Sequence, residues 1–388
     1  SNNAHGGAVS NERFYSFYNG TDIDGENSVA PGYLLDFPGT SGNCAACHAP
    51  GAAVDAPFDT DMNSIRGQLE AGIHCDFCHK VGGVYLNPAT QTLYPNAPGV
   101  ESQRLLRPPE GDDIFFGPYD DIHDPDTYLP AISDSAFCAP CHQFSFWGTP
   151  IYESYDEWLA SSYADAGVMC QDCHMPPNGD DYFALPEQGG LSHPPETIPS
   201  HLQLGAVSEE LLQNSVDMTL DAERVENLLK VSVTITNTEA GHHVPTDHPG
   251  RHLILTIETT GPSGRVLQQV GGGQAPSWAG DKAGYPGKAY AKVLQDVQTG
   301  EFPVVSYWKQ SLIKQDNRIP AQGVDESIYY FALPATADAI TVQATLRFRR
   351  LYADVAGEKA WVVPDILMEE ETMQLQIVQN RIFYPLIF

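Results

Sequence analysis

The chain has 388 residues, and its 50 Asp and Glu outweigh 20 Lys and Arg to give a net charge of −30. A balance this negative excludes a protein that wraps nucleic acid or lies on an anionic membrane. The hydrophobic content of 42% indicates a globular chain. No apolar run approaches the roughly 18–20 residues of a membrane span, and candidates such as 253–260 have only the length of a strand.

The acidic residues are concentrated in the first part of the chain. Residues 1–210 hold 5 Lys and Arg against 30 Asp and Glu, whereas residues 211–388 hold 15 against 20. All 8 cysteines and 9 of the 13 histidines also lie in residues 1–210. This break in composition predicts two domains, 1–210 and 211–388.

Every cysteine belongs to a Cys-x-x-Cys-His motif, which is typical of c-type haem attachment. Two thiols spaced by two residues reach the two vinyl groups of one porphyrin, and the imidazole that follows lies under the iron. Disulfides or zinc sites do not require a His after each of four pairs, and a thioredoxin-like redox site needs only one pair. The predicted attachment cysteines are Cys44, Cys47, Cys75, Cys78, Cys138, Cys141, Cys170 and Cys173, and the predicted proximal ligands are His48, His79, His142 and His174.

The spacing of the motifs repeats. The first two begin 31 residues apart, at 44 and 75, and the last two begin 32 residues apart, at 138 and 170. This favours a two-haem unit used twice, with coincidence in an irregular domain as the alternative. Prolines and glycines throughout residues 1–210 exclude long helices and predict short ones, at the motifs and near 64–70 and 155–164. Four macrocycles would supply the apolar core that such a domain lacks.

Nine further histidines are available for the distal side of four irons. Histidine on both sides is therefore favoured over methionine, which Met62, Met169, Met175 and Met218 offer. Some candidates stand in polar or proline-rich loops, which present an imidazole without a core to join. These loop candidates are His123, His193 and His201.

Three more distal candidates have open alternatives. His74 directly precedes Cys75, and it either serves a neighbouring haem or is satisfied by the backbone. His5 is predicted to bind an iron, in its own chain or in a neighbouring one. His242, followed by His243 at the end of a strand, is either a ligand projected from the second domain or a structural histidine.

Strands replace the irregular pattern from about residue 215. Alternation of apolar and polar residues predicts strands at 229–236, 253–259, 340–348 and 373–378. Strands with one polar face predict an antiparallel β-sandwich, and the aromatic segment 275–320 is expected to form long loops. No phosphate-binding loop or nucleophile elbow is present in the sequence, which favours a structural or docking role. The apolar segment 383–388 is expected to cover the chain's own core or to insert against a partner.

Two acidic clusters are candidate calcium sites. One is Asp22-x-Asp24-Gly25-x-Asn27, which lacks the later ligands of an EF-hand loop, and the other lies within 112–126. Solvated acidic loops are the alternative interpretation.

Several segments resemble the multihaem c-type cytochromes that have a haem domain followed by a β-rich domain. They are Cys170-Gln-Asp-Cys-His-Met-Pro176, the stretch 193–201, Thr236-Asn-Thr-Glu-Ala-Gly-His-His-Val-Pro-Thr246, 316–320 and 346–349, so that the resemblance spans most of residues 40–350. Asp247 stands where that family often has Gly. The group includes tetrahaem electron carriers of ammonia oxidisers and OmcE-type cytochromes, which polymerise into extracellular filaments. The resemblance implies that a histidine of one subunit can bind a haem of the next, an arrangement that would suit His5.

Together these observations predict an α+β protein, in which a loop-rich domain of short helices wraps four c-type haems and a β-sandwich follows. The predicted function is electron transfer without catalysis, by an exported, extracellular or cell-surface cytochrome that associates with itself into a conducting filament. The alternatives are a soluble periplasmic shuttle and a multihaem reductase with one open haem. The expected partners are redox proteins or extracellular acceptors.

Overall fold

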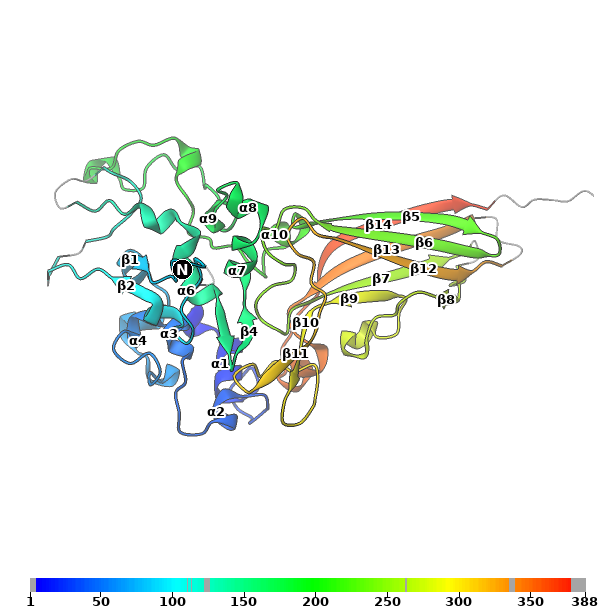
Figure 1. The fold of residues 1–388 in the computed structure, drawn as a ribbon, viewed down its shortest axis with the longest axis horizontal. Helices are drawn as coiled ribbons and strands as arrows, with labels where there is room; N and C mark the ends of the chain where they lie inside the picture. The colour runs from blue at the N-terminus through cyan, green and yellow to red at the C-terminus, as the bar shows by residue number, and fades with distance from the viewer. Residues whose placement is uncertain are drawn as a thin grey trace, which may run out of the picture.

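The computed structural model describes residues 5–109, 111–112, 114–121, 126–261, 264–334 and 339–377. His123 and the apolar segment 383–388 lie outside these ranges. Figure 1 shows a first part built of short helices and loops and a second part built of long strands. The change falls between α10 (Glu209–Gln213) and β5 (Val216–Val225). This mixture of helices and antiparallel sheets confirms the α+β class.

Each Cys-x-x-Cys-His motif lies on its own short helix: α3 (Cys44–His48), α5 (Cys75–Cys78), α6 (Ala139–His142) and α9 (Cys170–His174). The longest described helix is α1 (Glu12–Asn19), which Asn11 caps at its start and Gly20, at φ 71°, ends. The others are α2 (Tyr33–Asp36), α4 (Pro50–Ala53), α7 (Ser154–Leu159), α8 (Ser162–Asp165) and α11 (Ala353–Glu358). The 3-10 turns are Ala8–Ser10, Met62–Ser64, Gly67–Ala71, Gly99–Ser102, Pro130–Ser133, Ser135–Phe137, Pro186–Gln188, Pro195–Thr197 and Ser277–Lys282. Two small hairpins complete the first part, β1 (Val81–Val84) with β2 (Gln103–Leu105) and β3 (Phe144–Phe146) with β4 (Thr149–Tyr152).

The second part contains two four-stranded antiparallel sheets. One has the order β5, β6 (Leu228–Asn237), β12 (Val324–Ala332), β8 (Gln269–Gly271), and the other β14 (Ile366–Gln376), β13 (Ala339–Arg349), β7 (His252–Thr260), β9 (Gly287–Tyr290). Alternate residues of β6 are buried, and they join the inner residues of the second sheet in one apolar core. Each fully buried aliphatic side chain contributes roughly 1.5–3 kcal/mol to such a core. The four predicted strands are confirmed as β6, β7, β13 and the end of β14.

The prediction of long loops over 275–320 is wrong. That segment contains β9 and a separate antiparallel hairpin of β10 (Lys292–Asp296) and β11 (Ser311–Asp316). All but one residue of β10 are buried, and a bulge interrupts its register after Val293. A short strand that is buried on both faces lacks the alternation by which strands are recognised in a sequence.

Buried charged side chains join the two parts of the molecule. Arg318, which follows β11, donates to Glu157 Oε1 of α7 at 2.5 Å and to Asp316 Oδ2 at 2.7 Å. Lys292 of β10 donates to Glu153 Oε2 at 2.8 Å. Arg318 and Lys292 are both buried, so their charges depend on these carboxylates.

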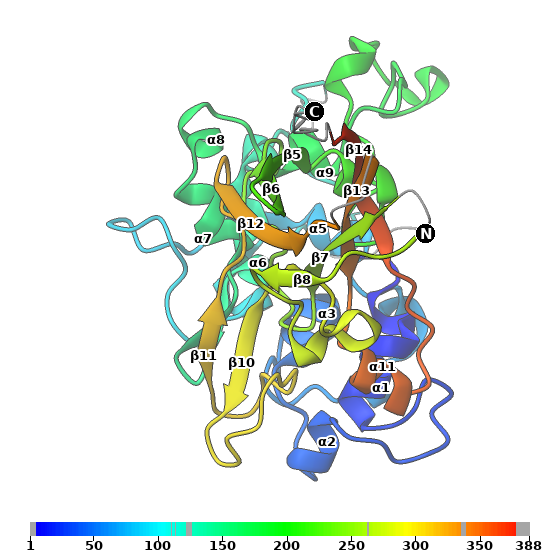
Figure 2. The same cartoon turned by 90° about the vertical axis from the view of Figure 1, so that its right-hand side faces the viewer.

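A second connection runs from α11 to the N-terminal region. Figure 2 shows α11 beside α1. Lys359, at the end of α11, is fully buried, and its Nζ donates to the carbonyl oxygens of Ser16 at 3.0 Å, Thr21 at 2.9 Å and Val29 at 3.0 Å. Burial lowers the pKa of this ammonium group to about 8.

Candidate cofactor site

One cavity of about 1610 Å³ collects most of the motif residues. It is larger than the roughly 300–1,000 Å³ of a typical small-molecule site, so it has room for more than one bound group. Its walls include both cysteines and the histidine of the second, third and fourth motifs. Four other predicted ligands also line it, and they are His5, His74, His201 and His242.

Three motif histidines each face a second histidine across this cavity. The ring centroids are 6.1 Å apart for His79 and His201, 6.2 Å for His174 and His242, and 6.2 Å for His142 and His5. Metal–imidazole bonds of about 2 Å on either side of one ion place two ring centres about 6 Å apart. Each pair therefore has the separation that one shared iron requires. The planes of the first two pairs differ by 33° and 16°, whereas those of His142 and His5 differ by 75°.

Hydrogen bonds at Nδ1 orient three of these rings. His79 Nδ1 bonds to the carbonyl oxygen of Phe116 at 2.6 Å, and His174 Nδ1 to that of Leu204 at 2.5 Å. His242 Nδ1 bonds to the carbonyl oxygen of His243 at 2.9 Å. A carbonyl accepts only from a protonated Nδ1, which leaves Nε2 with its lone pair available to a metal.

His142 differs because a carboxylate takes the place of the carbonyl. Its Nδ1 lies 3.3 Å from Asp247 Oδ2. The two oxygens of Asp247 also accept from the backbone N of Glu153 and of Ser154 and from Ser154 Oγ, so every partner of this side chain is a donor. Asp247 is thus a carboxylate beside a predicted iron ligand. Sequence reasoning did not select Asp247 as a site residue, and its only indication was that Asp stands where the multihaem cytochromes often have Gly.

His48, the histidine of the first motif, has different surroundings. The ring nearest to it is that of Phe14, with centroids 4.3 Å apart. Among the described residues, no imidazole lies at the separation seen in the other three motifs. Helix α3 is tightly packed here, because a Cβ on Gly99 would lie 2.0 Å from the carbonyl oxygen of Ala46. Burial lowers the pKa of His48 to about 4, so its imidazole is neutral.

The remaining predicted ligands have other positions. His74 caps α5, accepting from Phe77 N at 3.2 Å, while its buried Nε2 has no hydrogen-bond partner among the described residues. His193 Nε2 lies 2.8 Å from Asp121 Oδ2, and its ring contacts Tyr119. His123 lies outside the described residues.

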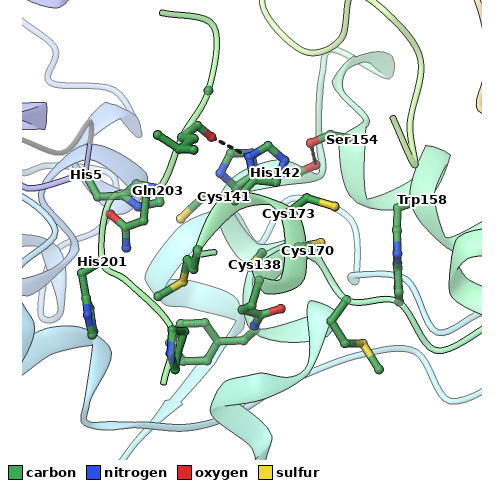
Figure 3. A pocket seen from close by; sticks show the side chains of 18 of the residues that line it. His5, Cys138, Cys141, His142, Ser154, Trp158, Cys170, Cys173, His201 and Gln203 are labelled. Carbon is green, nitrogen blue, oxygen red and sulfur yellow. Dashed lines mark hydrogen bonds between the residues drawn. The ribbon is translucent and has the colours of Figure 1, made fainter. Parts of the chain in front are cut away.

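The cysteines of different motifs are close to one another. Cys138 and Cys170 lie side by side in Figure 3 and share a hydrogen bond. Cys47 Sγ donates to the carbonyl oxygen of Pro140, between the two cysteines of the third motif, at 3.9 Å. Burial raises the pKa of Cys44 and of Cys78 to about 12, so both thiols are un-ionised. The third motif is therefore in contact with the first and the fourth.

The acidic cluster at Asp22 is held together by its own hydrogen bonds. The Asp22 carboxylate accepts from Glu26 N at 2.9 Å and from the side chain of Asn27. Within the described ranges, no group of three His, Cys, Asp or Glu side chains is arranged to hold a metal ion. None of the helices formed by described residues has the length and apolar character of a membrane span.

The fold is similar to that of a solved multihaem protein. The penta-haem cytochrome c552 from Thermochromatium tepidum superposes with a TM-score of 0.63 at 20% identity, over 86% of this chain and 83% of that chain. Two further likenesses are too weak to bear on the fold, the GAE domain of GGA2p from Saccharomyces cerevisiae (TM-score 0.16, 11% identity, 42% of this chain and 91% of that chain) and the ACE19 collagen-binding subdomain from Enterococcus faecalis (0.17, 10%, 42% and 97%). No family model and no curated protein matches the chain. At this level of identity the similarity establishes the fold that the chain shares with the c552 structure.

Proposed function

We propose that the chain is an exported tetrahaem c-type cytochrome that transfers electrons. The observation that carries this proposal is the set of three histidine pairs at 6.1–6.2 Å, each containing the histidine of one Cys-x-x-Cys-His motif. Haem c, once attached, supplies an iron that carries one electron at a time. Attachment at this motif occurs outside the cytoplasm, so the chain is expected to be exported, to the cell surface, the medium or the periplasm.

In this proposal each histidine has a defined role. His79, His142 and His174 are proximal ligands, and His201, His5 and His242 are the respective distal ligands. Two strong-field imidazoles leave an iron without an open position, which favours a carrier over an enzyme. The contacts of the third motif with the first and fourth support closely spaced haems, between which electrons pass without a bound substrate. Redox proteins or extracellular acceptors are the expected partners.

A filament is a second form that one observation favours. The first motif lacks an imidazole facing His48 among the described residues, and a neighbouring copy is one source of such a ligand. His5 is not needed for that role, because it already faces His142 of its own chain. His123, which lies outside the described residues, is the competing source of a ligand for His48.

The test is to express the exported chain with the cytochrome c maturation machinery and to count its haems. Intact mass and the pyridine haemochrome spectrum are expected to give four haems, and the double variant Cys170→Ala/Cys173→Ala is expected to give three. Fewer than four haems in the wild type would contradict the proposal.

The spin state of the iron bound by His48 then distinguishes the carrier, the filament and the reductase. Electron paramagnetic resonance of monomers and of assembled material, with electron microscopy, shows whether the His48 site becomes low-spin only on assembly. Low-spin irons in a dispersed monomer would contradict the filament. A high-spin iron that persists in every form would instead favour the reductase.

A further inference from the structure

Asp247 stands in a conformation and an environment that are both unfavourable for it. Its φ is 60°, in the left-handed region, and the residue is only 7% exposed. The left-handed conformation costs a residue other than glycine about 1–2 kcal/mol. Burial of a carboxylate costs several kcal/mol more unless the charge is paired. The contacts of this carboxylate must therefore offset both costs.

Four donors surround the carboxylate. Oδ1 accepts from the backbone N of Glu153 at 3.2 Å and of Ser154 at 3.1 Å. Oδ2 accepts from Ser154 Oγ at 3.1 Å and from His142 Nδ1 at 3.3 Å. Arg251 adds a nearby positive charge. Figure 3 shows Ser154 beside His142, so one carboxylate binds both the start of α7 and the ring of the third motif.

This partner distinguishes the third motif from the second and the fourth. His79 and His174 bond to neutral carbonyl oxygens at 2.6 and 2.5 Å, whereas the acceptor at His142 is a carboxylate oxygen of a side chain that only donors surround. The bond at 3.3 Å is longer than the other two, so its effect depends on charge more than on short distance. A buried charge acts strongly at that range because little water screens it.

A carboxylate at Nδ1 makes an imidazole a stronger donor to its metal. A stronger donor stabilises the more positive oxidation state of an iron, and second-shell hydrogen bonds are among the means by which proteins set haem potentials. We propose that Asp247 lowers the reduction potential of the iron bound by His142 below those of the irons bound by His79 and His174. This inference rests on the proposed function. Asp247 is a positioning residue here, since it acts through His142.

The experiment is a mediated redox titration of the fully haem-loaded protein, followed by optical and electron paramagnetic resonance spectra. Asp247→Asn keeps the shape of the side chain, and Asp247→Gly suits the left-handed backbone. Both are expected to move one component of the titration to higher potential and to leave the others in place. That component is identified as the one whose low-spin signal is lost in His5→Ala.

A variant that is expected to shift the potential in the opposite direction distinguishes this role of Asp247 from a purely structural one. Ser154→Ala removes a donor to Oδ2 and leaves more negative charge for His142, so the same component is expected to move to lower potential. Asp296→Asn, at a buried carboxylate bound to Lys309, is the control and is expected to move none. Unchanged titrations in the Asp247 variants, or shifts of one sign in Asp247→Asn and Ser154→Ala, would overturn the inference and leave the proposed function intact. A wild-type chain without attached haem would overturn both.

Discussion

At the scale of single residues, the immediate partner of an imidazole decides what that imidazole can do. His201 and His193 stand eight positions apart in the same proline-rich stretch. The ring of His201 faces His79 across the cavity, whereas Nε2 of His193 is bound to Asp121. Burial also lowers the pKa of His201, so its imidazole is neutral and able to bind a metal. Composition and spacing do not distinguish the two residues, because only the folded chain shows their partners.

Replacement of His201 tests this difference. His201→Ala is expected to retain four attached haems while one iron changes from low-spin to high-spin, since the covalent bonds are made by cysteines and only a distal ligand is lost. His193→Ala is the matched control and is expected to keep the low-spin signals of the wild type. Electron paramagnetic resonance, with haem counting by mass, provides the measurement. A low-spin spectrum in His201→Ala would show that another ligand serves the His79 site.

At the scale of elements, the sequence predicts what is local and periodic. The Cys-x-x-Cys-His motifs are complete within five residues, and the alternation of β6 or β13 is visible within ten. The strands β10 and β11 were not predicted. β10 is short and almost wholly buried, so it shows no alternation of apolar and polar residues, and a bulge breaks its register with β11. The match of His5 to His142 spans 137 positions, so no spacing rule reveals it. The contacts of Asp247 with His142 and Ser154 join residues 105 and 93 positions apart, so they too cannot be predicted from the sequence.

The packing of the turn Gly99–Ser102 against α3 requires glycine at position 99. A Cβ there would lie 2.0 Å from the carbonyl oxygen of Ala46, and φ is +56°. Gly39 also has a positive φ, of +80°, but a Cβ added to it would have no other atom within 4 Å. Gly39→Ala is therefore expected to lower the free energy of unfolding by about 1–2 kcal/mol, and Gly99→Ala by a further 1–3 kcal/mol or so. Denaturant unfolding followed by far-ultraviolet circular dichroism measures both, and equal losses would argue against the packing role.

At the scale of the whole molecule, the second part supplies positive charge to the acidic first part. Residues 1–210 carry a balance of −25, while Lys292 and Arg318 come from the nearly balanced remainder of the chain. Both bind carboxylates of the first part, Glu153 and Glu157, at a buried boundary. The ionic contacts thus fix the two parts relative to each other.

Removal of Arg318 is expected to weaken this boundary. Arg318→Leu leaves the buried side chain of Glu157 without this cation, and the loss of one partner of a buried pair costs about 3–5 kcal/mol. Thermal unfolding by calorimetry is the measurement. Lys230→Ala, which breaks the exposed pair with Glu223, is the control and is expected to leave the midpoint unchanged. An Arg318→Leu protein as stable as the wild type would mean that the boundary does not depend on this charge.

The same boundary is expected to depend on pH. Burial acts to raise the pKa of Glu157, but His243 and Arg318 outweigh it and lower that pKa to about 2 from an ordinary 4.5. The carboxylate therefore stabilises the fold fully above about pH 4.5, and this contribution is lost as the pH falls through 2. The difference in unfolding free energy between the wild type and Glu157→Gln should shrink as the pH falls from about 4.5 through 2. Denaturant unfolding of both proteins, from neutral pH down to about pH 2, provides the measurement. A difference that does not change with pH would contradict the expectation.

The buried ammonium group of Lys359 also bears on the order in which the molecule is completed. Its Nζ donates to the carbonyl oxygens of Ser16, Thr21 and Val29, although Lys359 lies 330 positions after Val29 in the chain. A chain made from its N-terminus thus leaves the region around α1 without this anchor until nearly all of it has been synthesised. The region around α1 therefore reaches its final packing only after Lys359 is available.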